Sequence, residues 1–179
     1  MTANGKHKNR REWVLAALEE YEGRLTSYAA RLLGDAELGR DAVQHTFLRL
    51  CDQSPHKLDG RLAPWLFTVC RNKSLDMIRS NGRAELPLHD DLAEPIGHEP
   101  DPAAVVEDSD IHEGLRRLIG QLPASQSEVI DLWLNGFAYR AIGEITERSE
   151  GAARVLLHRA LAALREHPWT QNLLDRIEN

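Results

Sequence analysis

The chain has 179 residues, and its 28 acidic and 22 basic side chains give a formal net charge of −6 at pH 7. This acidity argues against a protein that binds bare DNA through bulk electrostatic attraction. No apolar run approaches the roughly 20 residues that cross a bilayer, and the first residues lack the apolar core of a signal peptide, so we expect a cytoplasmic protein without membrane insertion. Because Cys51 and Cys70 lack a paired metal-ligand spacing, we expect reduced thiols, no metal and no cofactor.

Apolar residues recur at helical spacing and aromatic residues make up 6% of the chain, which predicts an all-α fold. A central segment, 85–110, contains no Lys or Arg but holds nine of the 28 acids and four prolines. Proline disfavours long helices and ladder pairing. We therefore predict two small helical domains joined by an acidic flexible linker, which is either a solvating spacer or an imitation of a nucleic-acid backbone inside a basic channel of a partner.

The first predicted helix runs from about Trp13 to Leu33 and carries one apolar stripe typical of core packing. The basic residues before it are interpreted as a frayed chain end. A second helix, from about Leu38 to Leu50, places an apolar side against the core. Its buried residues are expected to be Val43, Phe47 and Leu50, and its outward residues Asp41, Gln44, His45 and Leu48. An outward leucine among polar residues is either a neutral feature or part of a partner site.

The third predicted helix begins near Pro64, a residue suited to a first helical turn, and continues to Arg79. Its helical projection aligns Trp65, Asn72, Asp76 and Arg79 on one side. An aromatic ring, an amide and a guanidinium presented together can stack on an unpaired base and bind the adjoining phosphates. The alternative is that Trp65 belongs to the core while Asn72 and Asp76 hold a neighbouring loop.

The second half begins near Ile111 and is expected to contain helices over 125–134, 139–145 and 150–164. The turn at 146–149 is the short connection of a helix-turn-helix. In the last helix the expected buried stripe is Ala153, Leu157, Ala160, Leu161 and Leu164. The opposite face presents Ala152, Arg154, Val155, His158 and Arg159. A narrow face of this kind fits a major groove, where Arg159 can reach a guanine edge and Val155 a thymine methyl.

These residues carry a family resemblance. The runs are Asp41 to Leu50, Trp65-Leu66 through Arg71-Asn72 to Leu75-Asp76 and Arg79, Leu122-Pro123 followed by Val129-Ile130, Gly136 to Tyr139 with Ile142, and Leu157 to Ala160. In order and separation they resemble bacterial sigma factors of the extracytoplasmic-function class, which keep only sigma regions two and four. The resemblance covers about Leu18 to Arg165 and divides the chain into region two at 13–84, the linker at 85–110, region four at 111–167 and a short tail at 168–179.

The resemblance implies a subunit that binds core RNA polymerase and directs initiation at promoters. Its polymerase-binding residues would be Asp41, Gln44, His45 and Leu48, docked on the clamp helices of the β′ subunit, with the β subunit as a further contact. Trp65, Asn72, Asp76 and Arg79 would read and open the −10 element. Ala152, Arg154, Val155, His158 and Arg159 would read the −35 element. An anti-sigma factor is a further possible partner.

The sequence departs from the pattern of the family at several positions. Gly39 and Arg40 stand where acids are usual in the clamp-binding helix, and His45 also replaces a common acid. Val155 replaces a polar residue in the recognition helix, and Arg140 replaces an acid before Ile142. These changes predict weaker clamp binding and a base readout that rests on fewer polar groups.

Two other functions are considered. A stand-alone helix-turn-helix regulator conflicts with the net acidity and with the lack of an obvious ligand or dimerisation domain. An enzyme would have to use Asp41, His45, His89, Asp90 and Asp91, which the predicted elements divide between a solvent-facing helix and the linker. The tail at 168–179 is expected to be a short amphipathic helix on the second domain or a contact for a regulator.

Overall fold

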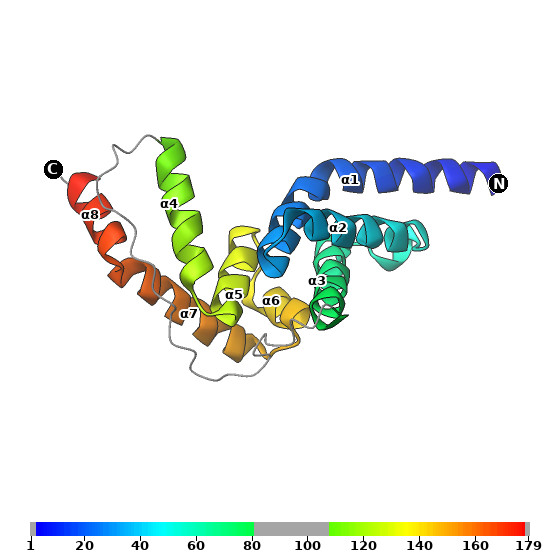
Figure 1. Cartoon of the computed structure of the whole chain (residues 1–179). Coiled ribbons are helices and arrows are strands. Elements are labelled where there is room, and N and C mark those ends of the chain that lie inside the picture. The colour runs from blue at the N-terminus through cyan, green and yellow to red at the C-terminus, as the bar shows by residue number, and fades with distance from the viewer. Residues whose placement is uncertain (1–2, 81–107, 178–179) are drawn as a thin grey trace.

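The computed structural model describes residues 3–80 and 108–177, which form helices joined by short turns (Figure 1). The helices are α1 Ala3–Leu33, α2 Ala36–Cys51, the 3-10 turn η1 Pro55–Lys57, α3 Leu62–Ser80, α4 Asp108–Gln121, α5 Ala124–Leu134, α6 Tyr139–Thr146, α7 Glu150–Glu166 and α8 Pro168–Ile177. No strand occurs among these residues. The all-α prediction is therefore confirmed, whereas the linker residues 85–107 lie outside the described part of the chain.

Helices α1 and α2 form a tight hairpin on which α3 packs (Figure 1). Asp35 begins α2, because its carboxylate accepts hydrogen bonds from the backbone N–H groups of Glu37 and Leu38 at 2.8 and 3.1 Å. Gly39 lets the two helices approach closely, since a Cβ there would lie 2.8 Å from the backbone nitrogen of Ala30. Gly39 therefore has a packing role that the comparison with the family pattern did not reveal.

The first helix is longer than predicted. It begins at Ala3 rather than near Trp13, so the interpretation of the preceding residues as a frayed end is wrong for the backbone. Lysine, arginine and glutamate are good helix formers, and the stretch contains no proline to stop the helix.

The second half contains the predicted helix-turn-helix in α6 and α7. Glu147 adopts a left-handed backbone conformation with φ 58°, and Ser149 accepts a hydrogen bond from the N–H of Ala152 at 3.1 Å. A Cβ on Gly143 would lie 2.7 Å from the carbonyl oxygen of Arg148, so the turn folds back tightly on α6. These contacts fix the angle at which α7 leaves the turn.

One residue of the predicted buried stripe of α7 is misplaced. Leu161 is 37% exposed, whereas Leu156 is buried. The buried residues recur three or four positions apart, and Leu161 lies about 100° around the helix from Ala160. The stripe is therefore Ala153, Leu156, Leu157, Ala160 and Leu164.

The tail forms helix α8 and packs on the second half, which confirms the first of its two predicted roles. Its Trp169 is partly buried, and a Cβ placed on Gly114 of α4 would lie 2.3 Å from the Trp169 ring. Within 3–80 and 108–177, no helix combines the length and apolar character needed to cross a membrane.

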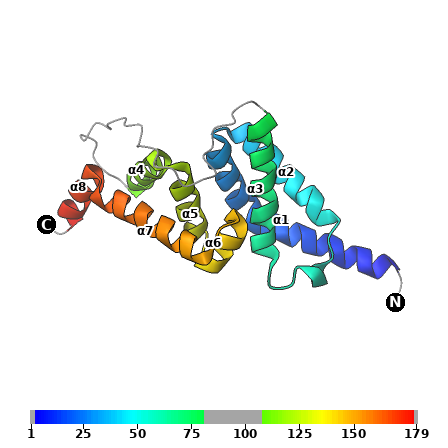
Figure 2. The same cartoon turned by 90° about the horizontal axis from the view of Figure 1, so that it is seen from below.

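The two halves of the molecule lie against each other. Helix α6 packs beside α3, and α5 contacts α1, an arrangement visible in both views (Figures 1 and 2). The rings of Tyr28, Phe67 and Phe137 connect the two cores, with centroid separations of 5.3 and 4.9 Å. Aromatic side chains thus join the halves at the centre of a mainly polar interface.

Candidate nucleic-acid interface

The outward face of α2 is open to solvent. Asp41, Gln44 and Leu48 are exposed, while His45 is partly buried. Leu48 is 67% exposed, although Val43, Phe47 and Leu50 on the other side are buried as predicted. Helix α2 packs on α1 and α3, so this face is available to a partner.

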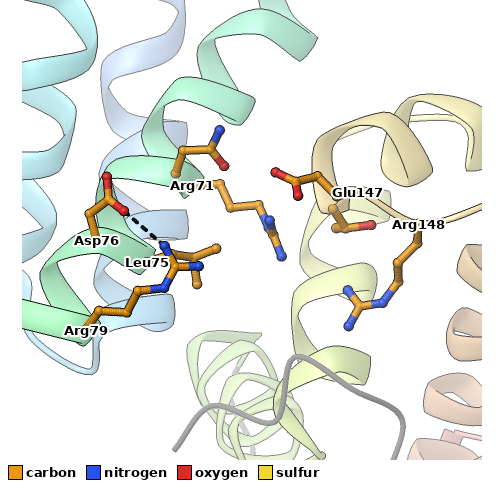
Figure 3. A pocket seen from close by; sticks show the side chains of 8 residues that line it. Arg71, Leu75, Asp76, Arg79, Glu147 and Arg148 are labelled. Atoms are coloured by element: carbon orange, nitrogen blue, oxygen red, sulfur yellow. Dashed lines mark hydrogen bonds and ion pairs between the residues drawn. The ribbon is translucent and has the colours of Figure 1, made fainter. Parts of the chain in front are cut away.

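The outward face of α3 borders a hollow of about 570 Å³ between the two halves. Asn72, Asp76 and Arg79 line one side of it, and Glu147 and Arg148 of the α6–α7 turn line the other. Arg79 Nη1 donates a hydrogen bond to Asp76 Oδ1 at 3.1 Å (Figure 3). The structure therefore brings three of the four predicted residues together, facing the second domain.

Trp65 is placed differently from the other three. It is partly buried against the core and lines a second hollow with Arg61 and Glu144. Its ring therefore combines the two alternatives: it packs on the core, and part of it remains accessible near α6.

A buried ion pair lies beside the first hollow. Arg71 Nε donates to Glu128 Oε1 at 2.7 Å, and the Tyr28 hydroxyl donates to the same oxygen at 3.0 Å. The Arg71 and Glu128 side chains are 3% and 7% exposed, and Arg148 Nη1 lies 3.7 Å from Glu128 Oε2. Figure 3 shows Arg71 and Arg148 directed toward the space between α3 and the turn. The single carboxylate of Glu128 thus links both halves.

Burial and charge act in opposite directions on these groups. Burial by itself would lower the pKa of Arg71, but the neighbouring Glu128 carboxylate outweighs it and raises the pKa. Burial and the Glu128 charge together raise the pKa of Tyr28 well above its ordinary value. Arg71 therefore remains charged and Tyr28 remains a neutral donor at physiological pH.

Three further polar contacts cross the interface. Arg31 pairs with Asp131, and burial raises the pKa of Asp131 despite this partner. Arg24 Nε donates to Asn135 Oδ1 at 3.1 Å. At the periphery, Arg61 Nη2 lies 3.6 Å from Glu144 Oε2. In each pair with a charged partner, the arginine comes from the first half and the acid from the second.

The outward face of α7 is largely exposed. Arg154, Val155, His158 and Arg159 are exposed, and Ala152 is partly exposed. Arg154 Nη2 donates to Glu150 Oε1 at 3.1 Å, and its guanidinium lies 5.1 Å from the centre of the Tyr139 ring. The predicted −35 residues therefore share one accessible surface.

The residues of the alternative enzyme do not form a described cluster. Asp41 is exposed on α2 and His45 is partly buried beside it, whereas His89, Asp90 and Asp91 lie outside the described residues. Among the residues that the structure describes, no group of three or more His, Cys, Asp or Glu side chains has the geometry to hold a metal ion.

Comparison with known proteins identifies both halves. Residues 17–84 match the family model of sigma-70 region 2, and residues 112–164 match that of sigma-70 region 4. The chain belongs to the extracytoplasmic-function class of RNA polymerase sigma factors. It directs the initiation of transcription at promoters, and the match to two sigma regions disfavours a stand-alone regulator.

The relatives span several bacterial groups. The chain is 34% identical over 150 residues to the sigma factor SigF of Caulobacter vibrioides, covering 80% of this chain and 78% of SigF. It is 32% identical over 160 residues to SigL of Mycobacterium tuberculosis, covering 84% and 85%. It is 26% identical over 152 residues to SigE of Mycolicibacterium smegmatis, of whose length it spans 59%.

Sequence reasoning missed the residues that join the halves. Arg71 and Glu128 are 57 positions apart, and neither stands out by periodicity or motif spacing as a partner of the other. The only available signal was a charged residue, Glu128, in the predicted apolar helix at 125–134. That signal indicates a buried pair only when its partner is known.

Proposed function

We propose that this sigma factor docks on core RNA polymerase through the outward face of α2. The observation that carries the proposal is an open face on which Leu48 is 67% exposed between the exposed Gln44 and the partly buried His45. An apolar side chain surrounded by polar ones is typical of a protein-binding surface. By resemblance the docking partners are the β′ clamp helices, with the β subunit as a further contact.

Promoter reading is divided between α3 and α7. Asn72 and Arg79 have donors for the phosphates and base edges of an unpaired −10 strand, Asp76 holds Arg79, and Trp65 contributes its accessible ring edge. On α7, Arg159 and Val155 suit a guanine edge and a thymine methyl of the −35 element, flanked by Ala152, Arg154 and His158. Binding to the unstacked strand offsets the cost of unpairing, so the factor acts without a catalytic group.

The same resemblance supports two further partners. The acidic segment 85–110 would follow the basic channels of the polymerase, and an anti-sigma factor would compete for the docking surfaces. These roles place the protein with RNA polymerase in the cytoplasm.

Run-off transcription tests the proposed function. Purified core polymerase would be given a library of genomic promoters with and without this protein. We expect new start sites that share two spaced sequence motifs. A folded protein that binds core polymerase but yields no new start sites would contradict the promoter-reading part of the proposal.

A further inference from the structure

The two halves meet through a built interface. Its centre holds the Phe67 and Phe137 rings at 4.9 Å and the ion pair between Arg71 and Glu128 at 2.7 Å. Both ionic side chains are almost fully buried, and Tyr28 satisfies the same carboxylate. Such matched donors and acceptors define one particular docking of the second domain on the first.

The interface covers the promoter-reading side of α3. The α6–α7 turn lies across the hollow from Asn72, Asp76 and Arg79 (Figure 3). Two acids of the second domain, Glu144 and Glu147, line the hollows that α3 borders. Their carboxylates stand close to the arginines and amide that would otherwise meet DNA phosphates, so they oppose a nucleic-acid strand both by occupying space and by repelling its charge.

The closed arrangement is also incompatible with reading both promoter elements. The −35 and −10 elements are separated by about 25 base pairs, or roughly 80 Å along B-form DNA. In the structure, α3 and α6 are in direct contact, with Arg61 and Glu144 atoms 3.6 Å apart. The domains must separate before they can bind one promoter, and the 27 residues between Ser80 and Asp108 span at most about 90 Å when extended.

The docking face of α2 is not covered by the same contact. Asp41, Gln44 and Leu48 remain exposed while the α3 face is covered. We propose that the second domain of the free factor is bound to its own first domain as an intramolecular competitor of promoter DNA, and that core polymerase, docking on α2, releases it. This inference rests on the proposed function of α2 and α3.

The chemistry of the interface suits a reversible contact. The cost of desolvating a buried ion pair offsets much of its attraction, so such a pair fixes geometry at a small net gain in free energy. Removing one partner is different, because the remaining charge is then buried without compensation. A change at Glu128 should therefore favour the open state, in which Arg71 is hydrated.

Energy transfer within the full chain tests the inference. A donor and an acceptor would be attached to the exposed Cys51 at the end of α2 and to Ala163→Cys on the exposed side of α7; Cys70 is buried. We expect high transfer efficiency in the free protein and low efficiency after core polymerase is added. The anisotropy of the same labels reports core binding independently of the distance between the domains.

Variants at Glu128 and Glu113 provide a matched comparison. Glu128→Gln should raise the ratio of open to closed molecules about tenfold without polymerase. It should also tighten binding of a short mixed-sequence single-stranded oligonucleotide about tenfold. Glu113→Gln removes the same charge from an exposed pair on α4 and should change neither quantity. If Glu128→Gln loses helicity, Glu144→Arg replaces it, and the added change Arg61→Glu should restore the closed state.

Several results would overturn the inference. They are low transfer efficiency in the free wild-type chain, high efficiency that persists after the anisotropy has risen, and an open fraction that the folded interface variants leave unchanged. If core polymerase does not change the anisotropy, the proposed function fails and the release step fails with it. The closed contact is still decided in that case by the free protein and the Glu128→Gln variant.

Discussion

Helices α2 and α3 pack on the same core, and each directs polar side chains away from it. The outward face of α2 meets solvent, with Leu48 67% exposed. The outward face of α3 meets the second domain, whose Glu147 and Arg148 lie across a hollow from Asn72. Periodicity therefore identifies which side of a helix leaves its own core, but the packing between domains decides whether that side is free.

Thiol modification compares the inner and outer sides of these helices most strongly. Cys51 is exposed at the end of α2, while Cys70 is buried in α3, where burial raises its pKa to about 11. At pH 8 such a thiol is ionised in about one molecule in a thousand, so iodoacetamide should label Cys70 at least that much more slowly than an ordinary thiol. Labelling of Cys70 should accelerate as the pH rises toward 11.

Mass spectrometry of the labelled peptides gives both rates. In urea the two cysteines should react at similar rates, which controls for local sequence. Equal rates in the native protein would show that Cys70 does not face the core.

Leu48→Asp tests the open face of α2. It should weaken binding to core polymerase about a hundredfold, because a charge replaces an apolar residue at the centre of the proposed contact. Leu15→Asp is the matched control, since Leu15 is 51% exposed on α1 and lies outside the docking face. Equal losses in a binding titration would refute the assignment of this face.

Gly39→Ala tests the close approach that positions α2. The added Cβ would lie 2.8 Å from the Ala30 backbone nitrogen, so we expect a loss of about 2 kcal/mol in the free energy of unfolding. Gly23→Ala has nothing within 4 Å of the new Cβ and should stabilise α1 by about 0.5–1 kcal/mol. Urea unfolding measures both, and a stable Gly39→Ala protein would contradict the packing role.

The face of α7 extends the comparison to a third helix, which is open like α2. Arg159→Ala combined with Val155→Ser should reduce the preference for the cognate −35 sequence about tenfold, because each replaces a proposed base contact. Arg165→Ala, on the exposed last turn of α7, should have little effect on sequence preference. Transcription competition between promoters measures the change, and an unaltered preference with intact core binding would exclude this recognition surface.

Arg79→Ala tests the covered face of α3 and has the smallest expected effect. We expect strand opening at the −10 element to fall about fivefold, since one strand contact is lost while the others remain. Arg117→Ala breaks a comparable exposed pair, with Glu113 at 3.1 Å, and should leave opening unchanged. Permanganate footprinting of unpaired thymines distinguishes the two variants.

The sequence predicted the individual helices well because their signals are local. Val43, Phe47 and Leu50 are buried and Leu48 is exposed, as the period of 3.6 residues requires. The turn at 146–149 was also predicted, although the tight approach at Gly143 appears only in the structure. The misplaced Leu161 shows the limit of a stripe that is drawn by spacing alone.

The contact between the domains was not predictable in the same way. Glu128 and Arg71 meet because α5 packs near α3, and no pattern within either helix specifies that meeting. Trp65 was left between two interpretations for the same reason, since its surroundings include Glu144 of the second domain. Contacts between distant segments depend on the assembled fold.

Photocrosslinking from two positions tests the contrast between α2 and α3 most directly. The photoreactive residue p-benzoylphenylalanine would replace Leu48 in one protein and Asn72 in another. We expect the probe at position 48 to crosslink to core polymerase, and the probe at position 72 to crosslink to residues 146–148 in the free chain and to promoter DNA in the open complex. A probe at position 72 that never reaches the second domain or DNA, or a probe at position 48 that does not reach the polymerase, would contradict the account.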